Sequence, residues 1–104
     1  MKDEHGHILV VDDHKTNRLK LSLGLKTQGH TVALAEDGQQ ALDMLRAEAF
    51  DVVLLDIIMP KLDGYQVLEQ MKSDSQLRDI PVIMISAVED IERHITSNSE
   101  LLSA

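Results

Sequence analysis

The sequence contains no cysteine and no tryptophan, and its 104 residues include a single tyrosine and a single phenylalanine. Without cysteine the chain forms neither a disulfide bond nor a thiolate metal site, which fits the reducing cytoplasm. So few aromatic side chains cannot form the stacking surface on which binders of single-stranded nucleic acid hold their bases. We therefore expect a cytoplasmic protein that does not bind nucleic acid by base stacking.

Positive charge is also scarce, because 10 Lys and Arg residues face 18 Asp and Glu residues and leave a net charge of −8. A DNA or RNA surface needs clustered basic side chains to contact phosphates, so direct nucleic-acid binding is not expected. The longest apolar runs have four or five residues, and the polar start MKDEH does not resemble a signal peptide. These runs are too short to span a membrane.

A chain of this length is expected to form a single domain spanning residues 1–104. Three apolar runs, at 8–11, 52–55 and 82–85, are rich in β-branched residues and apolar on both alternating faces. This pattern predicts strands of a parallel sheet that are buried on both sides. Residues 31–35 form a weaker strand candidate between two glycines.

The segments between these strands carry apolar residues at helical spacing. Residues 37–49 and 63–72 carry apolar residues on one helical face, after Asp37 and Asp63, which are suited to N-capping. Gln66 stands three residues after Asp63, as a capping box requires. Two further helices are expected here.

Residues 19–25 are ambiguous, because leucine at every second position is the period of a strand. A helix is nevertheless predicted, since two buried parallel strands need a long crossover that is normally helical. The leucines also form i, i+4 pairs, Leu19 with Leu23 and Leu21 with Leu25. The resulting alternation of strands and helices predicts an α/β doubly wound fold.

Ligands of such folds bind beyond the carboxyl ends of the strands. The polar residues at these ends are Asp12, Asp13, Glu36, Asp37, Asp56 and Ser86. Asp12, Asp13 and Asp56 would meet if the first and third strands are neighbours. Two charges about 4 Å apart repel by roughly 4 kcal/mol at an effective dielectric constant of about 20, so a cation is expected between them. Oxygen ligands favour Mg²⁺, with Mn²⁺ as an alternative.

A carboxylate beside such a cation can attack a phosphoryl group and form an acyl phosphate. Asp56 follows a stiff apolar strand and is the best nucleophile candidate, with Asp12 and Asp13 as metal ligands. The segments VVDD (10–13), LLDIIMPKLDG (54–64) and VIMISA (82–87) resemble the receiver domain of two-component response regulators in order and spacing. The resemblance covers about residues 7–95 and leaves 96–104 as an atypical tail. It implies a flavodoxin-like parallel sheet.

The resemblance also implies the role of individual residues. Asp56 would accept a phosphoryl group from a sensor histidine kinase or a phosphotransfer protein. Asp13 would bind Mg²⁺ directly, Asp12 would act through the metal's waters, and the backbone carbonyl of Ile58 would complete the shell. Ser86 would turn toward the phosphoryl group and switch a neighbouring surface. The domain would be a signalling module and not an enzyme.

Four other residues match residues that surround the phosphorylation site of receiver domains. Ala87 matches the small residue that leaves access to the phosphoryl group. Met59, Pro60 and Gly64 match the residues that shape the loop after the acceptor. Lys15 and Arg18 could guide a phosphate, although such residues more often form a solvated helix face.

The sequence departs from the family near its end. Receivers carry a fifth strand ending in Lys-Pro, whose Lys contacts the acceptor, but no Lys follows Lys72 here. The expected fold is therefore truncated after the fourth strand-helix unit, with the fifth strand and last helix absent. Asp56 should then have a raised pKa through repulsion, and phosphorylation should be slow or absent. Residues 82–85 become an apolar edge strand, which predicts self-association.

Several alternatives stay open. The chain could be an interaction module with the receiver fold but without competent phosphorylation. An Asp-nucleophile phosphatase normally has a second Asp two residues after the nucleophile, where this chain has Ile58. Asp12 and Asp13 could simply cap a helix. His5, His7 and His14 could bind zinc with one of these acids, although imidazoles just before a strand are usually solvated.

Overall fold

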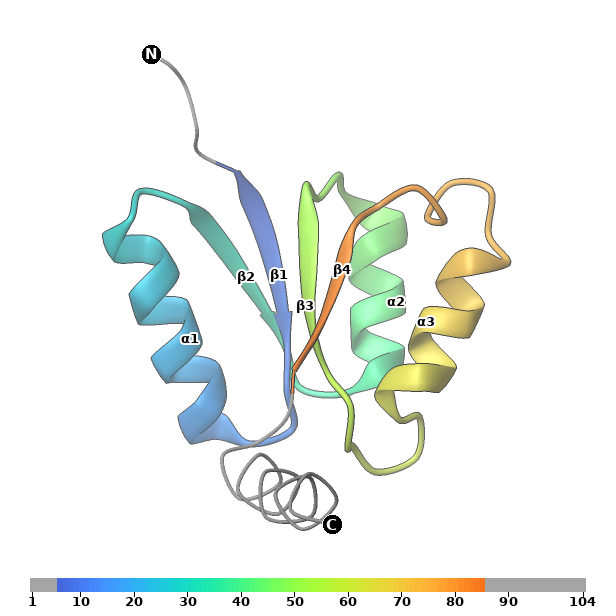
Figure 1. The fold of residues 1–104 in the computed structure, drawn as a ribbon, viewed down its shortest axis with the longest axis horizontal. Coiled ribbons are helices and arrows are strands. Elements are labelled where there is room, and N and C mark those ends of the chain that lie inside the picture. Colours follow the sequence, from blue (N-terminus) through green and yellow to red (C-terminus); the bar gives the residue numbers. More distant parts are fainter. Residues whose placement is uncertain (1–5, 86–104) are drawn as a thin grey trace, which may run out of the picture.

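The computed structural model describes residues 6–85 as one parallel sheet with helices on both faces (Figure 1). The strands lie in the order β2-β1-β3-β4. Their bounds are His7–Val11 for β1, Thr31–Ala35 for β2, Val52–Asp56 for β3 and Val82–Ile85 for β4. The helices are α1 (Lys15–Thr27), α2 (Gly38–Ala47) and α3 (Gly64–Lys72). The predicted α/β parallel fold is confirmed. The predictions about the missing fifth strand, Ser86 and Ala87 concern residues outside the described range.

The central strand β1 is the most deeply buried part of the sheet. Leu9 and Val11 belong to the core between the sheet and helices α2 and α3, together with Leu42, Val67 and Met71. On the opposite face, α1 packs against β1 and β2 (Figure 1). Because both faces of β1 are covered, its residues are apolar without alternation, as the sequence predicted.

Helix α1 contains the ambiguous leucines, and the predicted helix is confirmed. A helical period of 3.6 residues divides the alternating leucines between two faces. Leu21 and Leu25 are half-buried, whereas Leu19 and Leu23 remain 52% and 65% exposed. Helix α1 therefore crosses between two parallel strands and still presents an apolar stripe on its outer face.

The expected N-caps of α2 and α3 are both present. The Asp37 carboxylate accepts the Gln40 N–H at 2.8 Å, and the Asp63 carboxylate accepts the Gln66 N–H at 2.9 Å. Gln66 accepts the Asp63 N–H at 2.9 Å in return and completes the predicted capping box. At the other end, α2 stops at Ala47, so the predicted helix over 37–49 is too long and Ala49 is exposed beyond it.

Strand β4 differs from the expectation that all three apolar runs are buried on both sides. Within the described residues it pairs with β3 only and forms an edge of the sheet. Val82 and Met84 pack against the core, but Ile83 is 53% exposed. Within residues 6–85 the reason is that α1, the helix on this face, packs against β1 and β2 and not against β4. None of the helices in residues 6–85 has the length and apolar character that crossing a membrane requires.

The capping box of α3 generates a prediction about stability. Asp63→Ala leaves the N-terminal N–H groups of α3 without their acceptor and is expected to lower the free energy of unfolding by about 1 kcal/mol. Urea titration followed by circular dichroism measures this change. The exposed Asp79 supplies a matched control, Asp79→Ala, and equal effects of the two substitutions would contradict the importance of the cap.

Candidate functional site at the ends of β1 and β3

The parallel pairing of β1 with β3 brings three predicted site residues to one edge of the sheet. Val11 lies opposite Leu55 in the register, so Asp12 and Asp56 leave their strands side by side. Asp12, Asp13, His14 and Asp56 each offer a ligand atom, and these atoms all lie within 4.8 Å of one another. The first and third strands are neighbours, so the condition for these acids to meet is fulfilled. Glu36 and Asp37, which follow β2, are not part of this cluster.

Asp12 is buried and is held by backbone contacts at the end of β1. Its N–H donates to the Ala35 carbonyl at 3.1 Å, and its carboxylate accepts the His14 N–H at 2.8 Å. The N-cap residue of α1 is His14, so the alternative in which Asp12 and Asp13 cap this helix is wrong, although the Asp12 carboxylate does bond the N–H of His14.

Arg18 donates to the Asp12 carbonyl at 2.7 Å. Arg18 is thus a half-buried support of the site and not only a solvated residue.

The loop after β3 is shaped by one close backbone approach. The Gly64 N–H donates to the Ile57 carbonyl at 2.8 Å, and a Cβ on Gly64 would lie 2.8 Å from the Ile57 Cα. Only glycine fits at this position without displacing the backbone that carries Asp56. Met59 in this loop is buried, whereas Pro60 is exposed.

Asp56 is fully buried, and its surroundings disfavour the charged form. The pKa of Asp56 is raised from 3.8 to about 7, mainly by burial; the negative charges of Asp12 and Asp13 contribute to this rise, and the N–H of Ile58 opposes it. The direction matches the expectation, but burial and not repulsion is the largest cause. The carboxylate of Asp13 is the main reason why the pKa of His14 lies above 6.5.

Two carboxylate oxygens in the cluster lack a hydrogen-bond donor. Asp13 Oδ1 and Asp56 Oδ2 are buried and accept no hydrogen bond. Among residues 6–85, no Lys or Arg side chain forms an ion pair with Asp12, Asp13 or Asp56. Buried oxygens that lack partners and converge on one point are the donors that a divalent cation requires. The residues present therefore fit Mg²⁺ or Mn²⁺.

The histidines do not gather at one zinc site. His7 begins β1, at the end of the strand opposite the acids, where its Nε2 lies 2.8 Å from Glu48 Oε2. Its ring stacks on Phe50 with centroids 4.3 Å apart. His14 lies beside the acids, and its Nδ1 is 3.1 Å from Asp13 Oδ1. A zinc site that combines His7 with His14 is therefore ruled out, and His5 lies outside the described residues.

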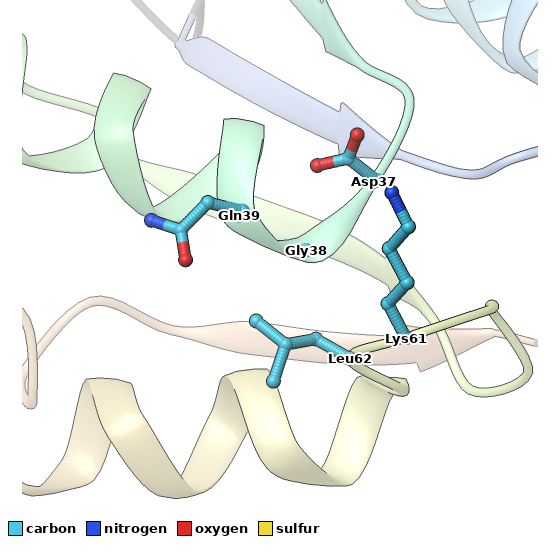
Figure 2. A pocket seen from close by; sticks show the side chains of 5 residues that line it. All are labelled: Asp37, Gly38, Gln39, Lys61 and Leu62. Atoms are coloured by element: carbon cyan, nitrogen blue, oxygen red, sulfur yellow. The ribbon is translucent and has the colours of Figure 1, made fainter.

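A small pocket of about 80 Å³ lies at the start of α2, lined by Asp37, Gly38, Gln39, Lys61 and Leu62 (Figure 2). Figure 2 shows the Lys61 side chain extending toward Asp37 across its mouth. Pockets for organic ligands usually measure about 300–1,000 Å³. This pocket is too small for such a ligand, and the acid cluster remains the candidate functional site.

Comparison of the sequence with protein families matches the response regulator receiver domain over residues 8–99. The chain is 44% identical over 89 residues to the probable transcriptional regulator ycf27 of Guillardia theta, covering 86% of this chain and 34% of that protein. It is 38% identical over 88 residues to the response regulator MprA of Mycolicibacterium vanbaalenii, covering 85% and 37%. The chain thus spans about a third of the length of these relatives.

Solved structures show the same fold. The N-terminal domain of a response regulator receiver protein from Methanoculleus marisnigri JR1 superposes with a TM-score of 0.75 at 40% identity, covering 76% of this chain and 64% of that one. The Vibrio cholerae chemotaxis protein CheY4 gives a TM-score of 0.74 at 28% identity, covering 85% and 76%. The parallel sheet and its helices thus belong to a known architecture.

The raised pKa of Asp56 predicts how stability depends on pH in the absence of divalent cations. Between pH 3.8 and about 7 the folded protein keeps a proton on Asp56 that the unfolded chain releases, so the free energy of unfolding should fall as pH rises through this range. Asp56→Asn should remove this fall and stabilise the protein at pH 8 by on the order of 2 kcal/mol.

Urea unfolding in EDTA at several pH values from 4 to 8 measures this dependence. Asp79→Asn, which neutralises an exposed acid, is the matched control and should follow the wild type. Parallel pH profiles of the wild type and Asp56→Asn would show that Asp56 titrates normally.

Proposed function

This chain belongs to the response regulator receiver domain family, and we propose that it accepts a phosphoryl group on Asp56 from a sensor histidine kinase or a phosphotransfer protein. The observation that carries this proposal is the buried Asp56 Oδ2, which has no hydrogen-bond partner and lies among two other carboxylates at the end of β3. A nucleophile needs such a free electron pair on a rigid support.

The proposed transfer is a displacement at phosphorus. Asp56 Oδ2 attacks the phosphorus of a phosphohistidine, a P–O bond forms, and the N–P bond breaks as the electron pair returns to the partner's imidazole. Asp56 must be ionised for this attack. Asp13 and Asp12 would hold Mg²⁺, or Mn²⁺, together with the Ile58 carbonyl. When bound, the cation supplies the positive charge that favours ionised Asp56 and neutralises the phosphoryl oxygens.

The response to phosphorylation is proposed to start at the end of β4. Asp56 lies opposite Ile85 in the β3–β4 register, and the Ile57 N–H donates to the Ile85 carbonyl at 2.9 Å. The next two residues in the chain are Ser86 and Ala87. We propose that the Ser86 hydroxyl donates to the phosphoryl oxygens, that Ala87 leaves room for them, and that the added charge switches the neighbouring surface.

The outer face of α1 is the proposed docking surface for the phosphoryl donor. Leu19 and Leu23 are exposed on this helix, which begins directly after the acid cluster. A helix of the partner could cover this apolar stripe and bring its phosphohistidine to Asp56.

A second candidate is an interaction module that does not accept phosphoryl groups. The observation in its favour is that no Lys or Arg side chain among residues 6–85 forms an ion pair with the three acids. Both candidates are signalling functions without turnover of a substrate.

Intact-mass spectrometry after incubation with phosphoramidate and Mg²⁺ distinguishes the two candidates. The wild type should gain one phosphoryl group, whereas Asp56→Asn should gain none because the nucleophilic oxygen is lost. Omission of Mg²⁺ should abolish the gain. The control Asp79→Asn should behave as the wild type. Equal labelling of Asp56→Asn would contradict the assignment of the acceptor, and an unlabelled but folded wild type would favour the interaction module.

We also propose that the chain self-associates through β4. Among the described strands β4 is an edge, and Ile83 exposes an apolar side chain beside its unpaired backbone groups. Such an edge can pair with the same edge of a second copy.

Light scattering over a range of protein concentrations should show a monomer that converts to a dimer. Ile83→Lys should shift this equilibrium toward the monomer, because a charge is introduced at the edge. Leu23→Lys removes a comparably exposed apolar side chain from α1 and serves as the control, with no expected effect on association. A wild type that stays monomeric at the highest concentration would refute the interface.

A further inference from the structure

His14 is the only member of the cluster at the ends of β1 and β3 that is not a carboxylate. Its Nδ1 lies 3.1 Å from Asp13 Oδ1 and 3.4 Å from Asp12 Oδ1. Its ligand atom therefore lies within 4.8 Å of the oxygens of the three acids, and the site has four donors of two kinds.

The backbone places the imidazole there. His14 occupies the N-cap position of α1 with an extended backbone, φ −93° and ψ 114°, but its side chain forms no capping hydrogen bond. Its N–H is instead fixed to the Asp12 carboxylate at 2.8 Å. The ring is thus directed toward the acids by its backbone, while a 56% exposed side chain keeps the freedom to turn a nitrogen toward an ion.

A second observation indicates that the cluster takes a ligand. Asp56 is fully buried, yet its Oδ2 has no hydrogen-bond partner, and the buried Asp13 Oδ1 accepts no hydrogen bond and has only the ion-pair contact with His14 Nδ1. Buried acceptors are normally satisfied within the protein. These two oxygens are therefore available as ligands for a cation.

The donor chemistry selects the kind of cation. Carboxylates alone suit Mg²⁺ and Mn²⁺, whereas an imidazole nitrogen favours Ni²⁺, Co²⁺ and Zn²⁺, which also bind more tightly than Mn²⁺ to a given set of nitrogen and oxygen ligands. Three carboxylates and one imidazole are a ligand set that these ions accept. We propose that His14 is a direct ligand that makes this cluster a transition-metal site, with higher affinity for Ni²⁺, Co²⁺ and Zn²⁺ than for Mg²⁺. The inference rests on the cation site of the proposed function and adds a ligand and a selectivity to it.

The competing explanation is that His14 only forms an ion pair with Asp13. An exposed pair of this kind contributes little and has no metal preference. The two explanations differ in what the removal of the imidazole does to the binding of different ions.

Calorimetric titration of the whole chain with NiCl₂ and with MgCl₂ separates them. Loss of a group that merely orients a ligand already weakens metal binding about 10–100-fold, so His14→Asn should raise the Ni²⁺ dissociation constant by at least about tenfold. The Mg²⁺ dissociation constant should stay unchanged. His7→Asn removes a histidine at the opposite end of β1 and should change neither constant.

Equal Ni²⁺ affinities of the wild type and His14→Asn would overturn the inference. A second readout is spectroscopic. On titration of the wild type with ZnCl₂, the ring nitrogen signals of one histidine should shift in NMR spectra, and the absence of these signals from the His14→Asn spectrum assigns them. Shifts confined to other histidines would also overturn the inference. If Ni²⁺ binding depends on His14 but Mg²⁺ does not bind, the inference stands and the proposed Mg²⁺-dependent phosphorylation fails.

Discussion

The parallel pairing of β1 with β3 is the constraint on which the site depends. It sets the carboxyl ends of two buried strands next to each other, and each strand delivers acidic residues there. The intervening 40 or so residues must then form a crossover, an outer strand and a return helix, which accounts for α1, β2 and α2. Most of the described architecture follows from this one adjacency.

Burial of Asp56 makes the acid cluster chemically unusual. A carboxylate that is removed from water and surrounded by other carboxylates holds its proton up to neutral pH unless a positive charge is supplied. The loop after β3 maintains this burial, because Gly64 approaches the backbone of Ile57 and Met59 packs inward. The same features that destabilise the charged form create unpaired oxygens that attract a cation. A phosphoryl acceptor needs this combination of a rigid carboxylate and a nearby metal site.

Two surfaces near this centre expose apolar side chains. Helix α1 starts at the acid cluster and presents Leu19 and Leu23 outward, whereas β4 passes beside Asp56 and leaves Ile83 uncovered. A change at Asp56 is thus one strand away from an exposed apolar edge. If Asp56 accepts a phosphoryl group as proposed, this short path would give a physical basis for coupling that change to the proposed association.

The sequence alone determined the features that arise from local interactions. The apolar runs set the strands, and the hydrogen bonds made by Asp37 and Asp63 set the starts of α2 and α3, because cap and helix lie within three residues of each other. The identity of the three acids also followed from the sequence. Only the tertiary structure decided which leucines of α1 face outward and that Ile83 is exposed, since both depend on how α1 sits on the sheet. It also decided that Arg18 and His14 join the acids, because their roles depend on where the chain turns after β1 and carry no periodic signal.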